Sequence, residues 1–89
     1  MLFLVKVRVD AARLAEFGAR LQDGALSREA IRSDTYCLES DPAVGYSVWE
    51  AEDKSDFERR FAPWREYYAE VEALPVVSPA QAMARLMRS

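Results

Sequence analysis

Residues 2–9 predict a β-strand, because two different sets of side chains alternate along them. One face of this strand carries Phe3, Val5, Val7 and Val9, and the other carries Leu2, Leu4, Lys6 and Arg8. The spacing then becomes helical, with apolar residues at Leu14, Phe17 and Leu21. Asp10 is a good N-cap for this helix, and Gly24 suits the left-handed position at its C-terminus.

The middle of the chain predicts a β-hairpin. Strand-forming residues such as Tyr36 occur within 33–39, Pro42 suits a central turn position, and a third strand follows over 44–51. The segment 25–32 mixes polar and apolar residues without a clean period. It is compatible with a loop or with a short irregular helix.

A second helix is predicted to begin at Ser55, because Ser55 and Glu58 match the spacing of a capping box. Its apolar stripe consists of Phe57, Phe61, Trp64 and Tyr68. Pro63 removes a backbone donor inside this pattern, so we expect a kink or two short helices that meet near Ala62.

The last part of the chain predicts an edge strand and a short terminal helix. Residues 70–77 alternate again, and Pro75 favours a position at the edge of a sheet. Ser78 and Gln81 form a second capping-box pattern, with proline at the first helical position between them. The terminal helix carries Met83, Leu86 and Met87 on one side.

This order of elements predicts a single α+β domain over residues 1–89, with a ferredoxin-like βαββαβ fold, a C-terminal helix and a four-stranded antiparallel sheet. Helices cover one face of such a sheet. If the face with Phe3, Val5, Val7 and Val9 meets the helices, the other face carries Leu2, Leu4, Lys6 and Arg8, with either Ser47 and Trp49 or Tyr46 and Val48 beside them. Because an apolar face is unfavourable in water, we expect two sheets to pack face to face in a homodimer.

The composition excludes several classes of function. A chain of 89 residues is marginally stable as a monomer, and its net charge of −3 argues against nucleic-acid binding. The absence of histidine and the single Cys37 exclude a structural zinc site, and no cofactor fingerprint is present. The first residues are too short and too charged for a signal peptide or a membrane span. We therefore expect a cytoplasmic protein without a metal, a cofactor or a membrane partner.

The candidate catalytic residues are Lys6, Arg8, Glu70 and Glu72. The first and last strands of this fold are neighbours, so these opposite charges come within reach of each other. As a catalytic set, a carboxylate with a raised pKa would move a proton while a cation holds an anionic substrate or an enolate. As a structural set, they would form a ladder of ion pairs at a dimer interface, which is the favoured interpretation.

The candidate ligand-binding residues are Tyr36, Tyr46, Trp49 and Trp64, because a pocket lined with aromatic rings suits a small organic molecule. The alternative is that these rings belong to the core and to an interface, which the helical spacing favours for Trp64. Cys37 lacks a histidine base, so we expect it to be a small buried hydrophobic residue.

Three segments carry a family resemblance: Met1-Leu2-Phe3 with Val5-Lys6-Val7, then Tyr46-Ser47-Val48-Trp49-Glu50, then residues 71–82 with the ending Pro-Val-Val-Ser-Pro-Ala-Gln-Ala. They resemble the dimeric α/β-barrel proteins, and within them muconolactone delta-isomerase and related small proteins of unknown function. The resemblance implies a homodimer or a dimer of dimers, with pockets near the barrel. Leu4 stands where the isomerase pattern has a histidine, so the resemblance supports the fold more than the isomerase reaction.

The sequence thus favours a dimer that binds a small organic ligand, either anionic or aromatic, in a pocket between the sheet and the helices. The alternative is a cofactor-free isomerase or monooxygenase-like enzyme, in which Glu50, Glu70 or Glu72 works with Lys6 or Arg8. A subunit that only assembles with other chains is the third hypothesis.

Overall fold

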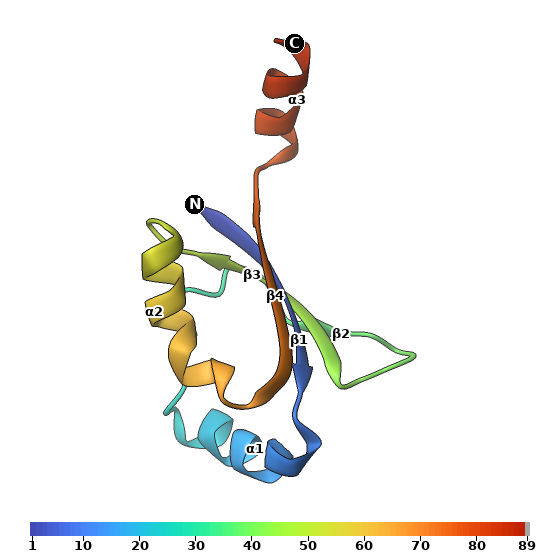
Figure 1. The fold of residues 1–89 in the computed structure, drawn as a ribbon, viewed down its shortest axis with the longest axis vertical. Coiled ribbons are helices and arrows are strands. Elements are labelled where there is room, and N and C mark those ends of the chain that lie inside the picture. The colour runs from blue at the N-terminus through green and yellow to red at the C-terminus, as the bar shows by residue number, and fades with distance from the viewer. Residues whose placement is uncertain (89) are drawn as a thin grey trace.

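A four-stranded antiparallel sheet organises the protein in a computed structural model that describes residues 1–88 (Figure 1). The elements in chain order are β1 (Leu2–Val9), the 3-10 helix η1 (Ala11–Arg13), α1 (Leu14–Asp23), β2 (Tyr36–Cys37), β3 (Val44–Glu50), α2 (Lys54–Arg65), β4 (Tyr68–Val76) and α3 (Pro79–Met87). The strand order across the sheet is β2-β3-β1-β4, so the first and last strands are neighbours. This arrangement confirms the predicted α+β, ferredoxin-like fold with a C-terminal helix.

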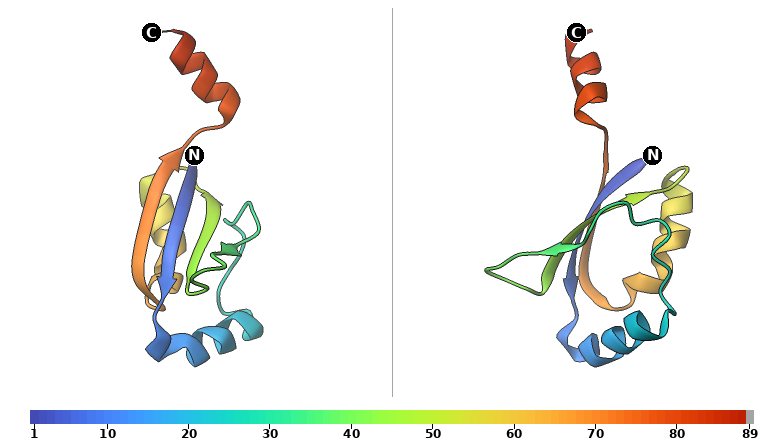
Figure 2. Two further views of the ribbon diagram at one scale, coloured as in Figure 1. Left: turned by 90° about the vertical axis from the view of Figure 1, so that its right-hand side faces the viewer. Right: turned by 180° about the vertical axis from the view of Figure 1, so that it is seen from behind.

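The helices take three different positions around the sheet. α2 lies along one face, α1 crosses the sheet at the C-terminal end of β1, and α3 projects beyond the opposite end (Figure 1 and Figure 2). β4 is an edge strand, as Pro75 predicts. No helix within residues 1–88 is long and apolar enough to cross a lipid bilayer.

The register of β1 and β3 decides which side of the third strand meets the helices. Phe3 pairs with Trp49 and Val5 with Ser47, and paired residues point to the same side of an antiparallel sheet. Trp49 therefore lies beneath the helices, where only 2% of its surface is exposed. Tyr46 and Val48, which the sequence offered as the alternative pair, lie on the open face.

The core is built largely from aromatic rings between the sheet and α2. Phe3 stacks on Phe57 with ring centroids 4.6 Å apart, and Trp49 meets Phe61 edge to face at 5.2 Å. Phe57, Phe61 and Trp64 are all buried, so the predicted stripe of the second helix is confirmed for these three residues.

α2 begins earlier than the capping-box pattern predicts. Asp53 is the N-cap, and its carboxylate accepts a hydrogen bond of 2.8 Å from the amide of Asp56. Ser55 consequently lies inside the first turn, and its predicted role as the N-cap is wrong. An aspartate two residues upstream satisfies the same kind of free amide and adds a negative charge at the helix N-terminus.

The C-terminal half of α2 also differs from the prediction. The helix continues through Pro63 to Arg65, so the prediction of two short helices is wrong. Pro63 lies close to the last residue of the helix, where its missing amide costs a single backbone hydrogen bond. Tyr68 lies outside the helix and begins β4, so it was wrongly assigned to the helical stripe.

The predicted cap at Asp10 belongs to the 3-10 helix η1, which leads into α1. The Asp10 side chain accepts from the amide of Ala12, whereas the N-cap of α1 itself is Arg13, which makes no side-chain cap hydrogen bond. The predicted C-terminal position of Gly24 is confirmed by its left-handed φ of 77° after α1. Ser78 and Gln81 form the complete capping box of α3. α3 buries no residue against the rest of the described chain, and 55% of the Met83 surface is exposed.

The segment between α1 and β3 follows an irregular path. Within 25–32, Leu26 and Ala30 are buried, and Ile31 forms an isolated bridge to Trp49. The strand predicted over 33–39 is only two residues long in the structure. The rest of this segment contacts the edge of β3 through individual side-chain and backbone groups, without the regular pairing of a strand. The Ser33 hydroxyl, for example, accepts from the backbone amide of β3 residue Val48 at 2.9 Å.

Because Phe57 is buried between the sheet and α2, Phe57→Ala should lower the free energy of unfolding by about 3–5 kcal/mol. Urea denaturation followed by far-ultraviolet circular dichroism measures this loss. Met83→Ala is the control, because that side chain is exposed on α3 and should change the free energy by less than about 0.5 kcal/mol. An equal effect of both substitutions would contradict the assigned core.

Asp56 carries a pH-dependent part of the stability. Its buried carboxylate accepts from the Glu52 amide at 2.9 Å and pairs with Arg59 and Arg60, which lowers the pKa of Asp56 from 3.8 to about 2. The charged form is therefore favoured in the folded protein. Its stabilising effect is complete above the unfolded pKa and is lost as the pH falls toward 2.

Asp56→Asn should therefore lower the urea midpoint above pH 4, and the difference from the wild type should shrink progressively as the pH falls from 4 to 2. Urea titrations at several pH values between 2 and 7 check this dependence. Asp34→Asn is a matched control, because the Asp34 side chain makes no ion pair within residues 1–88. A constant difference between Asp56→Asn and the wild type across that range would contradict the assignment.

Candidate functional site

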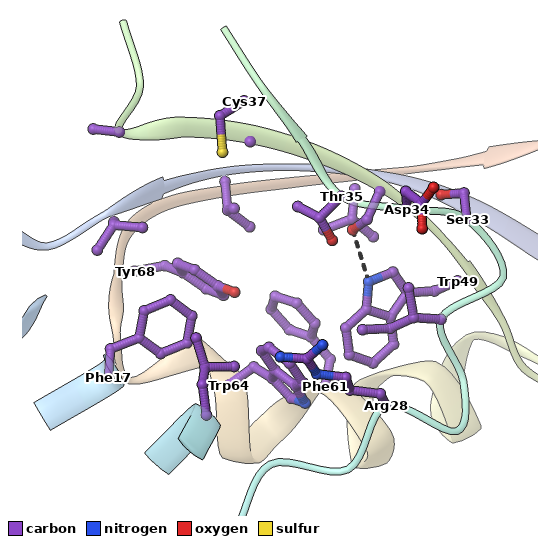
Figure 3. A pocket seen from close by; sticks show the side chains of 18 residues that line it. Phe17, Arg28, Ser33, Asp34, Thr35, Cys37, Trp49, Phe61, Trp64 and Tyr68 are labelled. Carbon is purple, nitrogen blue, oxygen red and sulfur yellow. Dashed lines mark hydrogen bonds between the residues drawn. The ribbon is translucent and has the colours of Figure 1, made fainter. Parts of the chain in front are cut away.

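A cavity of about 700 Å³ lies between the helix-facing side of the sheet, α1, α2 and the segment before β2 (Figure 3). The alternating side chains of β1 form part of its surface at Val5, Val7 and Val9. This face of the strand is apolar, as the sequence predicts. The cavity is large enough for a small organic molecule.

Five aromatic rings form one wall of the cavity. They are Phe17 from α1, Trp49 from β3, Phe61 and Trp64 from α2, and Tyr68 from β4. Their edge-to-face contacts hold the wall together, with centroid distances of 5.6 Å between Trp49 and Trp64 and 6.2 Å between Phe17 and Trp64. Phe17 and Tyr68 are half-buried and form the accessible part of this wall, whereas Phe61, Trp49 and Trp64 are buried behind them.

The two indole N–H groups are already engaged inside the protein. Trp49 Nε1 donates to Ser47 Oγ at 3.0 Å, and Trp64 Nε1 donates to the carbonyl oxygen of Ser27 at 3.2 Å. The hydrogen bond of Trp49 is the dashed line in Figure 3. Neither indole therefore offers a free N–H group to the cavity.

Polar side chains reach the cavity from the segment between α1 and β3. Arg28, Ser33, Asp34, Thr35 and Cys37 all line it. Arg28 extends over the aromatic wall, while Asp34 lies at the other side of the opening (Figure 3). Within residues 1–88, neither charged side chain makes an ion pair with another residue. The opening of the cavity thus carries one cation and one anion that are free to meet a ligand.

Tyr68 brings a hydroxyl group to the aromatic wall. It is the first residue of β4, paired with Val9, and its hydroxyl points into the cavity (Figure 3). Burial, together with the nearby Cys37, raises the pKa of Tyr68 to about 12. The phenol is therefore neutral at neutral pH and can donate a hydrogen bond.

The structure divides the four predicted ligand-binding residues between two surfaces. Trp49 and Trp64 line the cavity. Tyr36 and Tyr46 are paired with each other and lie outside the cavity, and 69% of the Tyr36 surface is exposed. The reason is the alternation of side chains, because the next residue of β2, Cys37, faces the cavity and Tyr36 must face away.

The four predicted catalytic residues gather on the opposite, open face of the sheet. Lys6 is paired with Glu72 and Arg8 with Glu70, around a depression of about 130 Å³. Arg8 contacts Glu70 at 3.5 Å, but its closer partner is Asp41 at 2.9 Å, which the sequence did not suggest. This is part of the expected ion-pair ladder. A catalytic role for the four residues stays a prediction.

Glu50, a further candidate carboxylate, is held in an ion pair. Arg32 Nε lies 2.7 Å from Glu50 Oε1, and this contact lowers the pKa of Glu50. A general acid needs the opposite shift. The charged form of Glu50 is therefore the favoured one.

Cys37 differs most from its prediction. It was expected to be a buried hydrophobic residue, but it is exposed and lines the cavity. β2 is a two-residue edge strand, so its inner side borders the cavity rather than a packed core. A Cβ atom placed on Gly45 would lie 3.6 Å from the Cys37 sulfur, an ordinary contact distance.

Sequence reasoning missed several residues of the cavity. Phe17, Phe61 and Tyr68 were recognised only as apolar helix positions. Arg28 belongs to the segment 25–32 that showed no clean period, and Asp34 belongs to the predicted strand over 33–39. For Cys37, the alternation of side chains along the predicted strand was the signal that could have placed it on the cavity side. Within residues 1–88, no group of three acidic or cysteine side chains is arranged to hold a metal ion.

The fold and the cavity together define a small α+β ferredoxin-like domain with an aromatic-lined cavity under its helices. The chain belongs to the family described as Domain of unknown function (DUF3303), whose model matches residues 1–89. No curated protein matches the chain.

Several solved structures are similar to this chain at low sequence identity. The 5-chloro-2-hydroxyhydroquinone dehydrochlorinase from Burkholderia phenoliruptrix AC1100, in complex with 2,5-dihydroxybenzoquinone, has a TM-score of 0.56 and 15% identity over 91% of this chain and 98% of that chain. An antibiotic biosynthesis monooxygenase has a TM-score of 0.48 and 12% identity over 88% and 100%. A conserved protein from Methanosarcina mazei Go1 has a TM-score of 0.48 and 15% identity over 85% and 92%. At these identities the likeness concerns the fold.

Proposed function

We propose that the protein binds a small planar organic molecule in the cavity beneath the helices. The observation that carries this proposal is an aromatic wall of five rings around a space of about 700 Å³, with few polar groups at its opening. Small-molecule sites in proteins combine these two features. Aromatic faces and edges recognise a flat ring by stacking and by edge-to-face contact.

The charges at the opening support an acidic group on this ligand. Arg28 extends over the aromatic wall and has no carboxylate partner within residues 1–88. A ligand anion would supply the missing partner, and a guanidinium is well suited to a planar oxyanion. Asp34 lies at the other side of the opening, so the anion would be directed toward Arg28.

A titration with 2,5-dihydroxybenzoquinone tests the proposal, because this compound is a planar ring with acidic hydroxyls and is the ligand in the dehydrochlorinase complex. Both tryptophans of the chain line the cavity, so binding should quench the intrinsic fluorescence with a saturable dependence on concentration. N-acetyltryptophanamide corrects for absorption of light by the probe. A linear, non-saturable response identical to that of the amide would contradict the proposal.

Arg28→Gln should weaken this binding by about two- to fivefold, because a partly exposed ion pair contributes modestly. The same fluorescence titration measures the change, and 0.5 M salt should reduce the wild-type affinity in the same direction. Arg85→Gln is the matched control, because Arg85 is on α3, far from the cavity. Equal affinities of wild type and Arg28→Gln would remove Arg28 from the site.

The second candidate function is a cofactor-free isomerase or monooxygenase-like enzyme that transfers a proton through a carboxylate. Its support is the grouping of Lys6, Arg8, Glu70 and Glu72 around the small depression. Those residues face away from the aromatic cavity, so a ligand in the cavity does not meet them. The resemblance to muconolactone delta-isomerase also stays a prediction. Binding in the cavity is therefore the better supported function.

We also propose that two copies of the chain associate through the open face of the sheet. Leu4 is paired with both Val48 and Leu74, which gives an apolar row across three strands. Tyr46 lies beside this row, and 47% of the Leu74 surface is exposed. Association would remove this apolar surface from water. A further pairing of dimers stays a prediction.

Light scattering coupled to size-exclusion chromatography checks the association. The wild type should have twice the mass of one chain, and Val48→Lys should have the mass of one chain, because it places a charge in the centre of the apolar row. Ala19→Lys adds the same charge to an exposed position of α1 and should leave the mass doubled. A wild-type protein with the mass of a single chain would contradict the proposal.

A further inference from the structure

We infer that the hydroxyl group of Tyr68 selects ligands that carry an oxygen acceptor, such as a ketone or a quinone carbonyl, on a planar ring. The inference rests on the proposed function, since it names the polar contact that a ligand would make in the same cavity. It assigns Tyr68 as a specificity-determining residue rather than as part of the core.

The position of the Tyr68 ring is set by its neighbours. The ring stacks on Phe61 with centroids 5.9 Å apart and meets Phe17 edge to face at 5.5 Å. These contacts hold the ring on two sides, one from α2 and one from α1. With the ring held in this way, the hydroxyl has a defined direction, and it points into the cavity (Figure 3).

The hydroxyl itself has no hydrogen-bond partner in the part of the chain that the structure describes. Within residues 1–88 the Tyr68 side chain makes ring contacts but no hydrogen bond. Every fully buried side-chain nitrogen or oxygen of the described chain does have a partner, so the Tyr68 oxygen must be open to the cavity. A polar group in mostly apolar surroundings is favourable only when it is hydrogen-bonded, and a bound ligand can provide that bond.

Two neighbouring hydroxyl groups are already engaged. Ser47 Oγ accepts from the indole of Trp49, and Ser33 Oγ accepts from the amide of Val48. Tyr68 differs from them, because its hydroxyl rises from the aromatic wall and makes no hydrogen bond within residues 1–88. A neutral phenol against apolar rings donates most favourably to a carbonyl or phenolate oxygen. The ligand oxygen therefore lies at the wall, and the rest of the ring lies over the aromatic side chains.

A pair of probes with equal shape tests this inference. Acetophenone carries a carbonyl group where α-methylstyrene carries a methylene group, so the two differ in the oxygen acceptor. Two-dimensional NMR titrations can follow the indole N–H signals of Trp49 and Trp64, which both line the cavity. The wild type should bind acetophenone more tightly than α-methylstyrene. Tyr68→Phe should lower the affinity for acetophenone by about two- to tenfold and leave the affinity for α-methylstyrene unchanged.

Tyr46→Phe is the matched control, because it removes a hydroxyl from the open face of the sheet. It should leave the affinities of both probes unchanged. Tyr68→Phe should keep the wild-type urea midpoint, since the lost hydroxyl makes no hydrogen bond within residues 1–88. Equal binding of both probes, with no effect of Tyr68→Phe, would overturn the inference and keep the cavity as a binding site. If neither probe shifted the indole signals of the wild type, the proposed function and the inference would both fail.

Discussion

The alternation of side chains along β1 is the constraint on which the rest of the structure depends. β1 is flanked on both sides, by β3 and β4, so its two faces define the two faces of the whole sheet. Phe3 and Val5 are buried beneath α2, whereas Lys6 is exposed on the other side. Since paired strands share faces, this division passes from β1 to its neighbours. The aromatic cavity and the charged depression consequently lie on opposite sides of the sheet.

The aromatic residues of this protein have two roles at once. Phe61 and Trp64 are buried core residues, and they also form the wall of the cavity. Edge-to-face contacts of Trp49 with Phe61 and Trp64 hold these rings in place at the border of the open volume. Because the indole N–H groups are bonded within the protein, the wall is apolar apart from the Tyr68 hydroxyl. The chemistry of the cavity thus depends on a few groups with identifiable positions.

The comparisons with solved structures concern the fold of this chain and do not show its activity. The dehydrochlorinase shares most of the length of this chain at 15% identity, which is a likeness of backbone arrangement. One fold can carry many unrelated activities, so the function has to be argued from the side chains that line the site. In this protein those side chains are the rings of the wall, Arg28, which makes no ion pair among the described residues 1–88, and Tyr68 with its hydroxyl.

The sequence by itself determined the order of the strands and of the three α-helices, the two different faces of β1, the edge position of β4 and the side-chain caps at Asp10 and Ser78. These features follow from periodicity and from hydrogen bonds between close neighbours in the chain, which are visible in a short window of sequence.

Only the tertiary structure decided which side of β3 meets the helices, because alternation gives two faces without saying which one is covered. It also placed Asp53 rather than Ser55 at the start of α2, since both residues offer the same kind of cap and the fold uses one of them. The composition of the cavity depended on the tertiary structure more than either of these features. Arg28 and Cys37 reach the wall through an irregular segment whose path is set by contacts with β3 and α2, far away in sequence.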